Sequence, residues 1–146
     1  MMLLIDSARK EGTAVNVPGH YETDVLFFFD GSPDRLALYQ ALFRRLDAAF
    51  PQASVKVQKS QISFYSPRLF AMVSLPKRKR DPGIVVSFGL GRREPSPRVA
   101  VSVEAYPGRW THHVPAASEA ALDGELMGWL REAWDFSLLK ERRRTP

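Results

Sequence analysis

The spacing of apolar residues changes twice along this chain, and this change constrains the fold more than any other feature. Between residues 32 and 51, apolar side chains recur every three or four positions, as on one face of an amphipathic helix. From residue 54 to residue 115 they alternate, which is typical of strands, and from residue 118 the helical spacing returns. This order predicts an α+β fold: a single-domain, two-layer sandwich in which a mostly antiparallel sheet of five or six strands carries two main helices on one face.

The first helical segment has clear start and stop signals. Ser32 is a good N-cap residue, Pro33 suits the first helical position, and Pro51 ends the helix. Its predicted apolar face consists of Leu36, Tyr39, Phe43, Leu46 and Phe50. The preceding residues 24–29 fit either a short helix capped by Thr23 or a buried strand, because periodicity cannot separate the two over so few residues.

The second helical segment follows Ser118, which we predict as its N-cap. Its predicted apolar face consists of Leu122, Leu126, Trp129, Leu130 and Ala133. Between the two helices, the alternation changes parity around Lys59 and Gln61, which predicts a bulge or a tight turn there. Residues 69–75 are apolar on both faces, as in a central strand, and residues 84–90 alternate cleanly after an Asp-Pro-Gly turn signal.

The dipeptide Pro-Gly at residues 107–108 suits the centre of a tight turn, so the flanking segments are predicted to form a hairpin. A two-residue loop places Ala105 opposite Trp110 and Val103 opposite His112. His112 then shares a sheet face with Trp110. Its neighbour His113 points to the other face, because successive strand residues alternate.

On that other face, Glu104 becomes a diagonal neighbour of His113 in this register. The carboxylate could orient the imidazole for proton transfer, which makes His113 and Glu104 weak catalytic candidates. The structural alternative is that His112 is a hydrogen-bonded core histidine and His113 a surface residue. Adjacent strand histidines cannot chelate one metal ion together, and the sequence predicts no metal site and no cofactor.

Length and composition bound the remaining possibilities. The chain has 146 residues and no cysteine, which fits one domain and excludes disulfides, thiolate metal sites and a cysteine nucleophile. We expect an N-terminal arm over residues 1–20, the α+β domain over 21–137 and a basic tail over 138–146. No apolar run approaches the length needed to span a bilayer, so we expect a cytoplasmic protein without membrane contacts.

Four motifs occur along the chain in this order: KSQISF at residues 59–64, FAMV at 70–73, PGRWTHH at 107–113 and WLREAW at 129–134. Together they resemble the uncharacterised bacterial family catalogued as domain of unknown function 5655, over residues 25–136. Trp134 stands where the family pattern is expected to have Tyr. The resemblance implies a single α+β domain and no established activity, and the fusion of some relatives to nuclease-like modules implies an association with nucleic-acid systems.

Three functions remain open at this point. The leading one is a non-catalytic module that binds a small anionic ligand or a peptide, on a concave sheet face or at one end of the sheet. Its candidate ligand-binding residues are Lys59, Gln61, Tyr106, Arg109, Trp110, His112 and His113. The net charge of +5 favours anionic partners in general, and the sequence indicates no oligomeric state.

The first alternative is a nucleic-acid-associated domain. Four consecutive cations in a hairpin loop could straddle a phosphate backbone. They are Lys77, Arg78, Lys79 and Arg80. The second alternative is an acid–base enzyme that uses His113.

Overall fold

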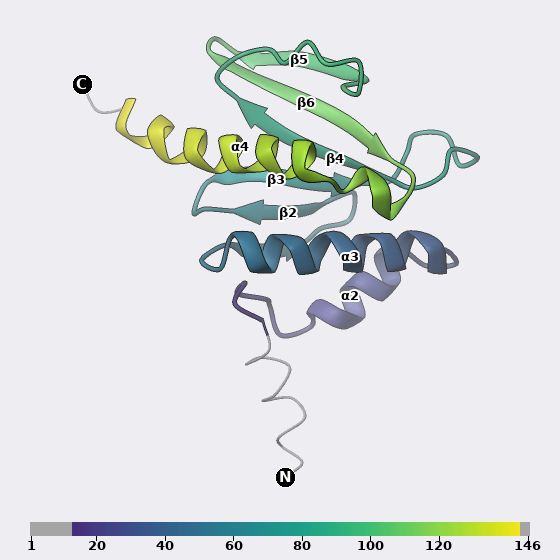
Figure 1. Cartoon of the computed structure of the whole chain (residues 1–146). Coiled ribbons are helices and arrows are strands. Elements are labelled where there is room, and N and C mark those ends of the chain that lie inside the picture. Colours follow the sequence, from purple (N-terminus) through teal and green to yellow (C-terminus); the bar gives the residue numbers. More distant parts are fainter. Residues whose placement is uncertain (1–12, 144–146) are drawn as a thin grey trace.

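A computed structural model describes residues 13–143 and shows one sheet with all helices on one side (Figure 1). The helices are α2 (Tyr21–Phe28), α3 (Pro33–Ala49), the 3-10 turn η1 (Glu119–Ala121) and α4 (Gly124–Arg143). The strands are β1 (Ser54–Val57), β2 (Ile62–Tyr65), β3 (Leu69–Ser74), β4 (Ile84–Leu90), β5 (Val101–Tyr106) and β6 (Arg109–Ala116). The predicted α+β fold is confirmed.

The six strands form an open antiparallel sheet in the order β1-β2-β3-β4-β6-β5. β3 and β4 lie at its centre, as the two-sided apolar character of residues 69–75 predicted. β6 inserts between β4 and β5, which leaves β5 as an edge strand. The alternating side chains of β4 that point toward the helices are all buried: Ile84, Val86, Phe88 and Leu90.

Helix α3 begins and ends where the sequence indicated. Pro33 occupies its first turn, and the backbone N–H of Leu36 donates to the Ser32 carbonyl. Its buried face includes Tyr39, Leu46 and Phe50 as predicted, but is wider than the predicted one. The buried residues of α3 are Leu38, Tyr39, Ala41, Leu42 and Leu46, whereas Leu36 and Phe43 are only half-buried. The difference arises because α3 packs against both the sheet and α2, so its apolar surface covers more than one stripe.

The starts of the other two helices differ from prediction. α2 begins at Tyr21, so residues 24–29 are helical up to Phe28 and Thr23 lies inside the helix rather than at its cap. Ser118 precedes the short η1 turn and is not the N-cap of α4. The Asp123 carboxylate takes that role, since its Oδ1 accepts from the Leu126 N–H at 3.0 Å.

The parity change between β1 and β2 is a tight turn, which is one of the two predicted outcomes. The Gln58 N–H donates to the Gln61 carbonyl at 2.8 Å, and Val57 pairs with Ile62 directly beyond the turn. Of the expected N-terminal arm, residues 1–12 lie outside the described part. The rest is attached to the domain, because Asn16 bridges to Ser54 beside β1.

Within residues 13–143, no helix combines the length and the apolar character needed to cross a membrane. The last residues of the expected basic tail, 144–146, lie outside the described part.

Candidate functional site

The hairpin between β5 and β6 contains the predicted turn, but its register differs from prediction. Tyr106 pairs with Arg109 across the turn, where Gly108 adopts a φ of 84° that only glycine takes easily. An irregularity between Glu104 and Tyr106 then shifts the pairing, so that Glu104 rather than Ala105 lies opposite Trp110. The predicted register beyond the turn is therefore wrong by one residue.

This shift separates the two weak catalytic candidates. Glu104 shares a face with Trp110, and its Oε2 accepts from the Gly108 N–H at 3.3 Å. His113 lies opposite Val101 on the other face. The expected contact between Glu104 and His113 is therefore wrong, because a bulge in β5 exchanges the faces of the residues that precede it.

His112 is a buried core histidine. Its Nε2 accepts from the Glu94 N–H at 2.9 Å, and its ring stacks on Phe88 with a centroid distance of 5.3 Å. Burial lowers the pKa of His112 below 6.5. A ring held in this way stabilises the loop before β5 and does not reach an external ligand.

His113 points away from the helices and forms a hydrogen bond with Ser87, in which Nδ1 and Oγ are 2.7 Å apart. Burial lowers the pKa of His113, and the nearby positive charge of Lys77 lowers it further. The imidazole is therefore neutral near pH 7.

The sheet face opposite the helices is called the open face below. A row of paired residues crosses it from β1 to β5: Lys56, Ser63, Met72, Ser87, His113 and Val101. Arg109 and Thr111 continue the same face along β6, because every second residue of a strand before His113 shares its face. The only carboxylate in the six strands is Glu104, which faces the other way. The strands thus give the open face positive and hydroxyl groups and no negative charge.

Arg109 is the most distinctive residue at the end of this face. Its side chain is half-buried and lies over Gly89 of β4, where an added Cβ would overlap the guanidinium. Among the described side chains it forms no ion pair, and its one hydrogen bond is a long contact of 3.4 Å from Nη1 to Thr111 Oγ1. A half-buried guanidinium without a carboxylate partner keeps N–H donors that can bind the oxygens of an anion.

A cavity of about 170 Å³ opens beside Arg109, between the end of the sheet and α4. Its lining residues are Arg68, Leu69, Gly89, Tyr106, Arg109, Ala133, Phe136 and Ser137. Arg68 comes from the turn between β2 and β3, and its Nε is buried. Arg68 is not among the residues predicted from the sequence, because no local motif shows that this turn residue approaches the start of β6.

The other predicted ligand-binding residues lie elsewhere. Lys59 lines a different cavity of about 300 Å³ beside α2, with Phe27 among its neighbours. Gln61 donates from Nε2 to Ser63 Oγ at 2.8 Å, within the β1–β2 turn. Trp110 faces the helix side of the sheet. Of the predicted set, Tyr106 and Arg109 are brought together at one cavity, whereas Lys59 and Trp110 do not join them.

The four basic residues 77–80 form an exposed loop between β3 and β4. Arg35 of α3 holds the base of this loop, because its Nε donates to the Gly83 carbonyl at 2.8 Å and its Nη2 donates to the Asp81 carbonyl. Lys77 approaches His113 closely enough to affect its pKa, so the loop adjoins the open face. Within the described part of the chain, no three His, Asp or Glu residues are grouped so as to hold a metal ion.

Comparison with known proteins adds one finding. No curated protein and no solved structure matches this sequence. Residues 27–137 match a family model described as domain of unknown function (DUF5655). This match covers most of the chain, from the end of α2 to the last third of α4, and nearly the same residues as the resemblance over 25–136. The chain therefore belongs to the DUF5655 family.

Proposed function

We propose that this domain binds the anionic group of a small ligand or a peptide in the cavity between the sheet end and α4, with Arg109 as its principal contact. The observation that carries the proposal is the half-buried Arg109 guanidinium, which has no carboxylate partner among the described side chains. Arginine offers a planar set of N–H donors that fits carboxylate and phosphate oxygens. The proposal therefore concerns a carboxylate or phosphate group.

The surroundings of Arg109 support this chemistry. Arg68 brings a second guanidinium to the same cavity, and the absence of a Cβ at Gly89 leaves room for the first. Further cations border the open face at Lys56 and Lys77. Their field adds to the positive potential over the open face and raises the local concentration of anions there.

The size of the cavity limits what enters it. A volume of about 170 Å³ accommodates a carboxylate or phosphate group, but is below the range of about 300–1,000 Å³ typical of sites for whole small molecules. The rest of the ligand then lies outside, along Thr111 and the open face. A phosphorylated or acidic peptide side chain and a phosphate monoester all meet this requirement.

The test uses inorganic phosphate and acetate as separate probes, titrated by calorimetry at low ionic strength. Arg109→Gln is the test variant, and Arg78→Gln in the exposed loop is the control with the same change in net charge. We expect the affinity to fall about tenfold or more for Arg109→Gln, as for loss of a charge-assisted hydrogen bond. The control is expected to change it less than about twofold, since an exposed charge contributes little.

Binding of phosphate but not acetate would assign the site to phosphate groups. Binding of acetate but not phosphate would assign it to carboxylates. If neither probe binds, the proposal fails. If both variants lose affinity equally, the charge of the whole protein rather than Arg109 is responsible for binding, and the proposal also fails.

A second candidate function, nucleic-acid binding, is favoured by one observation. The four cations of residues 77–80 are all exposed and border the open face through Lys77. A phosphate backbone could contact this loop and the open face together. Binding to a single-stranded or duplex oligonucleotide should then weaken steeply with salt, and the slope should decrease by about one for each cation of the loop that is replaced by alanine. Binding that does not depend on salt, or no binding at low salt, would exclude it.

A further inference from the structure

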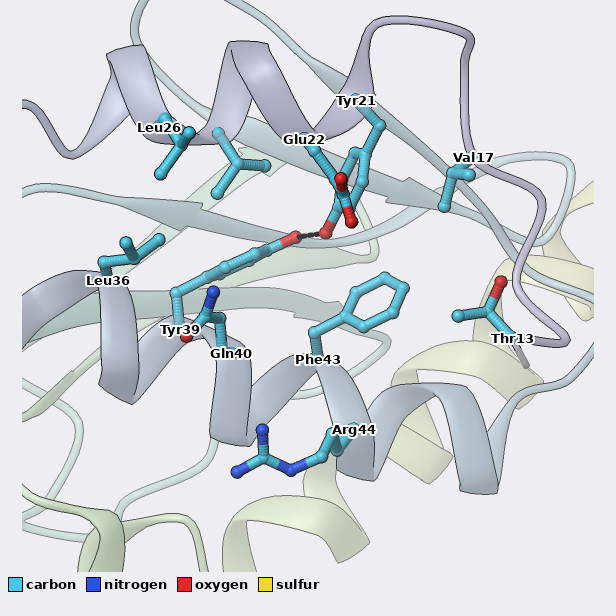
Figure 2. Close-up of a pocket in the computed structure, with 11 residues that line it drawn as sticks. Thr13, Val17, Tyr21, Glu22, Leu26, Leu36, Tyr39, Gln40, Phe43 and Arg44 are labelled. Atoms are coloured by element: carbon cyan, nitrogen blue, oxygen red, sulfur yellow. Dashed lines mark hydrogen bonds between the residues drawn. The ribbon is translucent and has the colours of Figure 1, made fainter. Parts of the chain in front are cut away.

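A second cavity lies far from the sheet end, between α2 and α3. It has a volume of about 530 Å³, within the range typical of sites for small molecules. Its lining residues are Thr13, Val17, Tyr21, Glu22, Val25, Leu26, Leu36, Tyr39, Gln40, Phe43 and Arg44. Figure 2 shows that aromatic and aliphatic side chains from both helices surround it.

Two tyrosine hydroxyl groups meet inside this apolar cavity. Tyr21 Oη and Tyr39 Oη are 2.5 Å apart, and the two side chains reach each other from α2 and α3 (Figure 2). Tyr39 is 1% exposed and Tyr21 is 9% exposed, so Tyr21 is the member of the pair with the greater access to the cavity. Burial raises the pKa of both hydroxyl groups well above the ordinary value. Both therefore stay protonated at neutral pH.

The pair leaves one donor unused. Each phenol has one O–H group, and a single hydrogen bond between the two consumes only one of these protons. The hydroxyl that accepts still carries its own proton, and no other described residue accepts from either hydroxyl. A buried donor without an acceptor is unfavourable, and a ligand oxygen in the cavity would satisfy it.

The walls define the rest of the ligand. Val25 and Leu36 present aliphatic surfaces, and Phe43 packs against Tyr21 with ring centroids 5.4 Å apart. The polar residues Glu22, Gln40 and Arg44 are exposed and stand at the rim. Such a cavity fits a flat, mostly apolar molecule that carries one polar atom, with this atom next to the two tyrosine hydroxyl groups.

We propose that the cavity between α2 and α3 binds a small aromatic molecule that carries a carbonyl or hydroxyl oxygen, and that the Tyr21–Tyr39 pair donates a hydrogen bond to that oxygen. The aromatic ring lies among Val25, Leu36 and Phe43. This site is separate from the one at Arg109, because the two cavities share no lining residue. It is independent of the proposed anion binding, and either can hold without the other.

The test compares acetophenone with ethylbenzene, which has nearly the same shape but carries no oxygen. Their affinities are measured by calorimetry or ligand-observed NMR with the full chain. The test variant combines Tyr21→Phe with Tyr39→Phe, which removes both donors and keeps both rings. One substitution alone would not suffice, since the remaining hydroxyl could turn to the ligand. Replacing both partners of a buried hydrogen bond by apolar groups is close to neutral for stability, so we expect the double variant to fold.

We expect the preference for acetophenone over ethylbenzene to fall about tenfold in the double variant, as for loss of one buried hydrogen bond. Tyr65→Phe, a tyrosine change on the sheet, is the control and should leave the preference unchanged. A preference that survives in the double variant would overturn the assigned role of the tyrosine pair.

A second measurement uses the unaltered chain and does not depend on the variants folding. Acetophenone bound in this cavity should give nuclear Overhauser effects to the methyl groups of Val25 and Leu36. Effects at other methyl groups only, or no saturable binding up to millimolar acetophenone, would overturn the proposal.

Discussion

The guanidinium of Arg109 occupies the space that a side chain at residue 89 would fill. Gly89 lies on the central strand β4 and faces the open side of the sheet, and an added Cβ would overlap the Arg109 side chain. Glycine in a strand interior weakens the strand and often marks the close approach of another group. Here that group is a half-buried cation, so the role of Gly89 is to position Arg109.

Gly89→Ala should therefore displace the Arg109 guanidinium from the cavity. We expect the affinity for inorganic phosphate to fall, while the fold is retained because the overlapping atoms belong to the far end of a flexible side chain. Gly128→Ala is the matched control: it lies in α4 with open space around it, and should raise helix stability by about 0.5–1 kcal/mol without affecting phosphate. Unchanged phosphate affinity in Gly89→Ala, measured by calorimetry, would show that Gly89 does not position Arg109.

The relation between Gly89 and Arg109 also shows what the sequence could and could not predict. Arg109 was identified from its place beside a turn, which is a local signal. Its contact with Gly89 depends on the pairing of β4 with β6, which no local pattern specifies. The approach of Arg68 to the same cavity depends in addition on how α4 lies across the end of the sheet.

The fold itself was largely predictable because it depends on periodicity. The alternation over residues 84–90 identified the strand β4, and the helical spacing after Pro33 identified α3. The register of the β5–β6 hairpin was not predictable, since the bulge beside Ala105 has no residue that marks it. A shift of one residue exchanges the faces of a strand, and so the predicted contact of Glu104 with His113 failed.

Asp123, rather than the predicted Ser118, is the N-cap of α4, and substitutions at the two residues can test this. Asp123→Ala should lower the free energy of unfolding measurably, because it removes the side-chain acceptor of the Leu126 N–H. The substitution also removes the ion pair between Asp123 and Arg98, which contributes less to stability because it is exposed to solvent. Ser118→Ala is the control and should change stability by less than about 0.5 kcal/mol, since Ser118 makes no side-chain cap hydrogen bond. Urea unfolding measures the stability of both variants. A larger loss for Ser118→Ala than for Asp123→Ala would show that Ser118 is the N-cap, as the sequence predicted.

The stacked rings at the centre of the sheet should dominate its stability. Phe88 is fully buried and stacks on both His112 and Trp129, with centroid distances of 5.3 and 5.7 Å. Phe88→Ala should cost about 3–5 kcal/mol, from lost burial and the cavity left behind. The same substitution at Phe27, which is 74% exposed, should cost about 0.5 kcal/mol or less. Similar losses for the two variants in urea unfolding would contradict the packing described for Phe88.

The stability of the domain should decrease in mild acid, in part because of His113. Burial lowers the pKa of His113 below 6.5, and Lys77 lowers it further, so the unfolded chain binds more protons than the folded one between the two pKa values. Stability therefore rises as the pH increases through that window and is lost as the pH falls through the folded pKa. His113→Gln should reduce this loss, measured as the free energy of urea unfolding at pH 7.5 and at several values below 6.5.

Part of the loss should remain, because burial also lowers the pKa of His112. A profile that is the same in His113→Gln would mean that burial and Lys77 do not lower the pKa of His113.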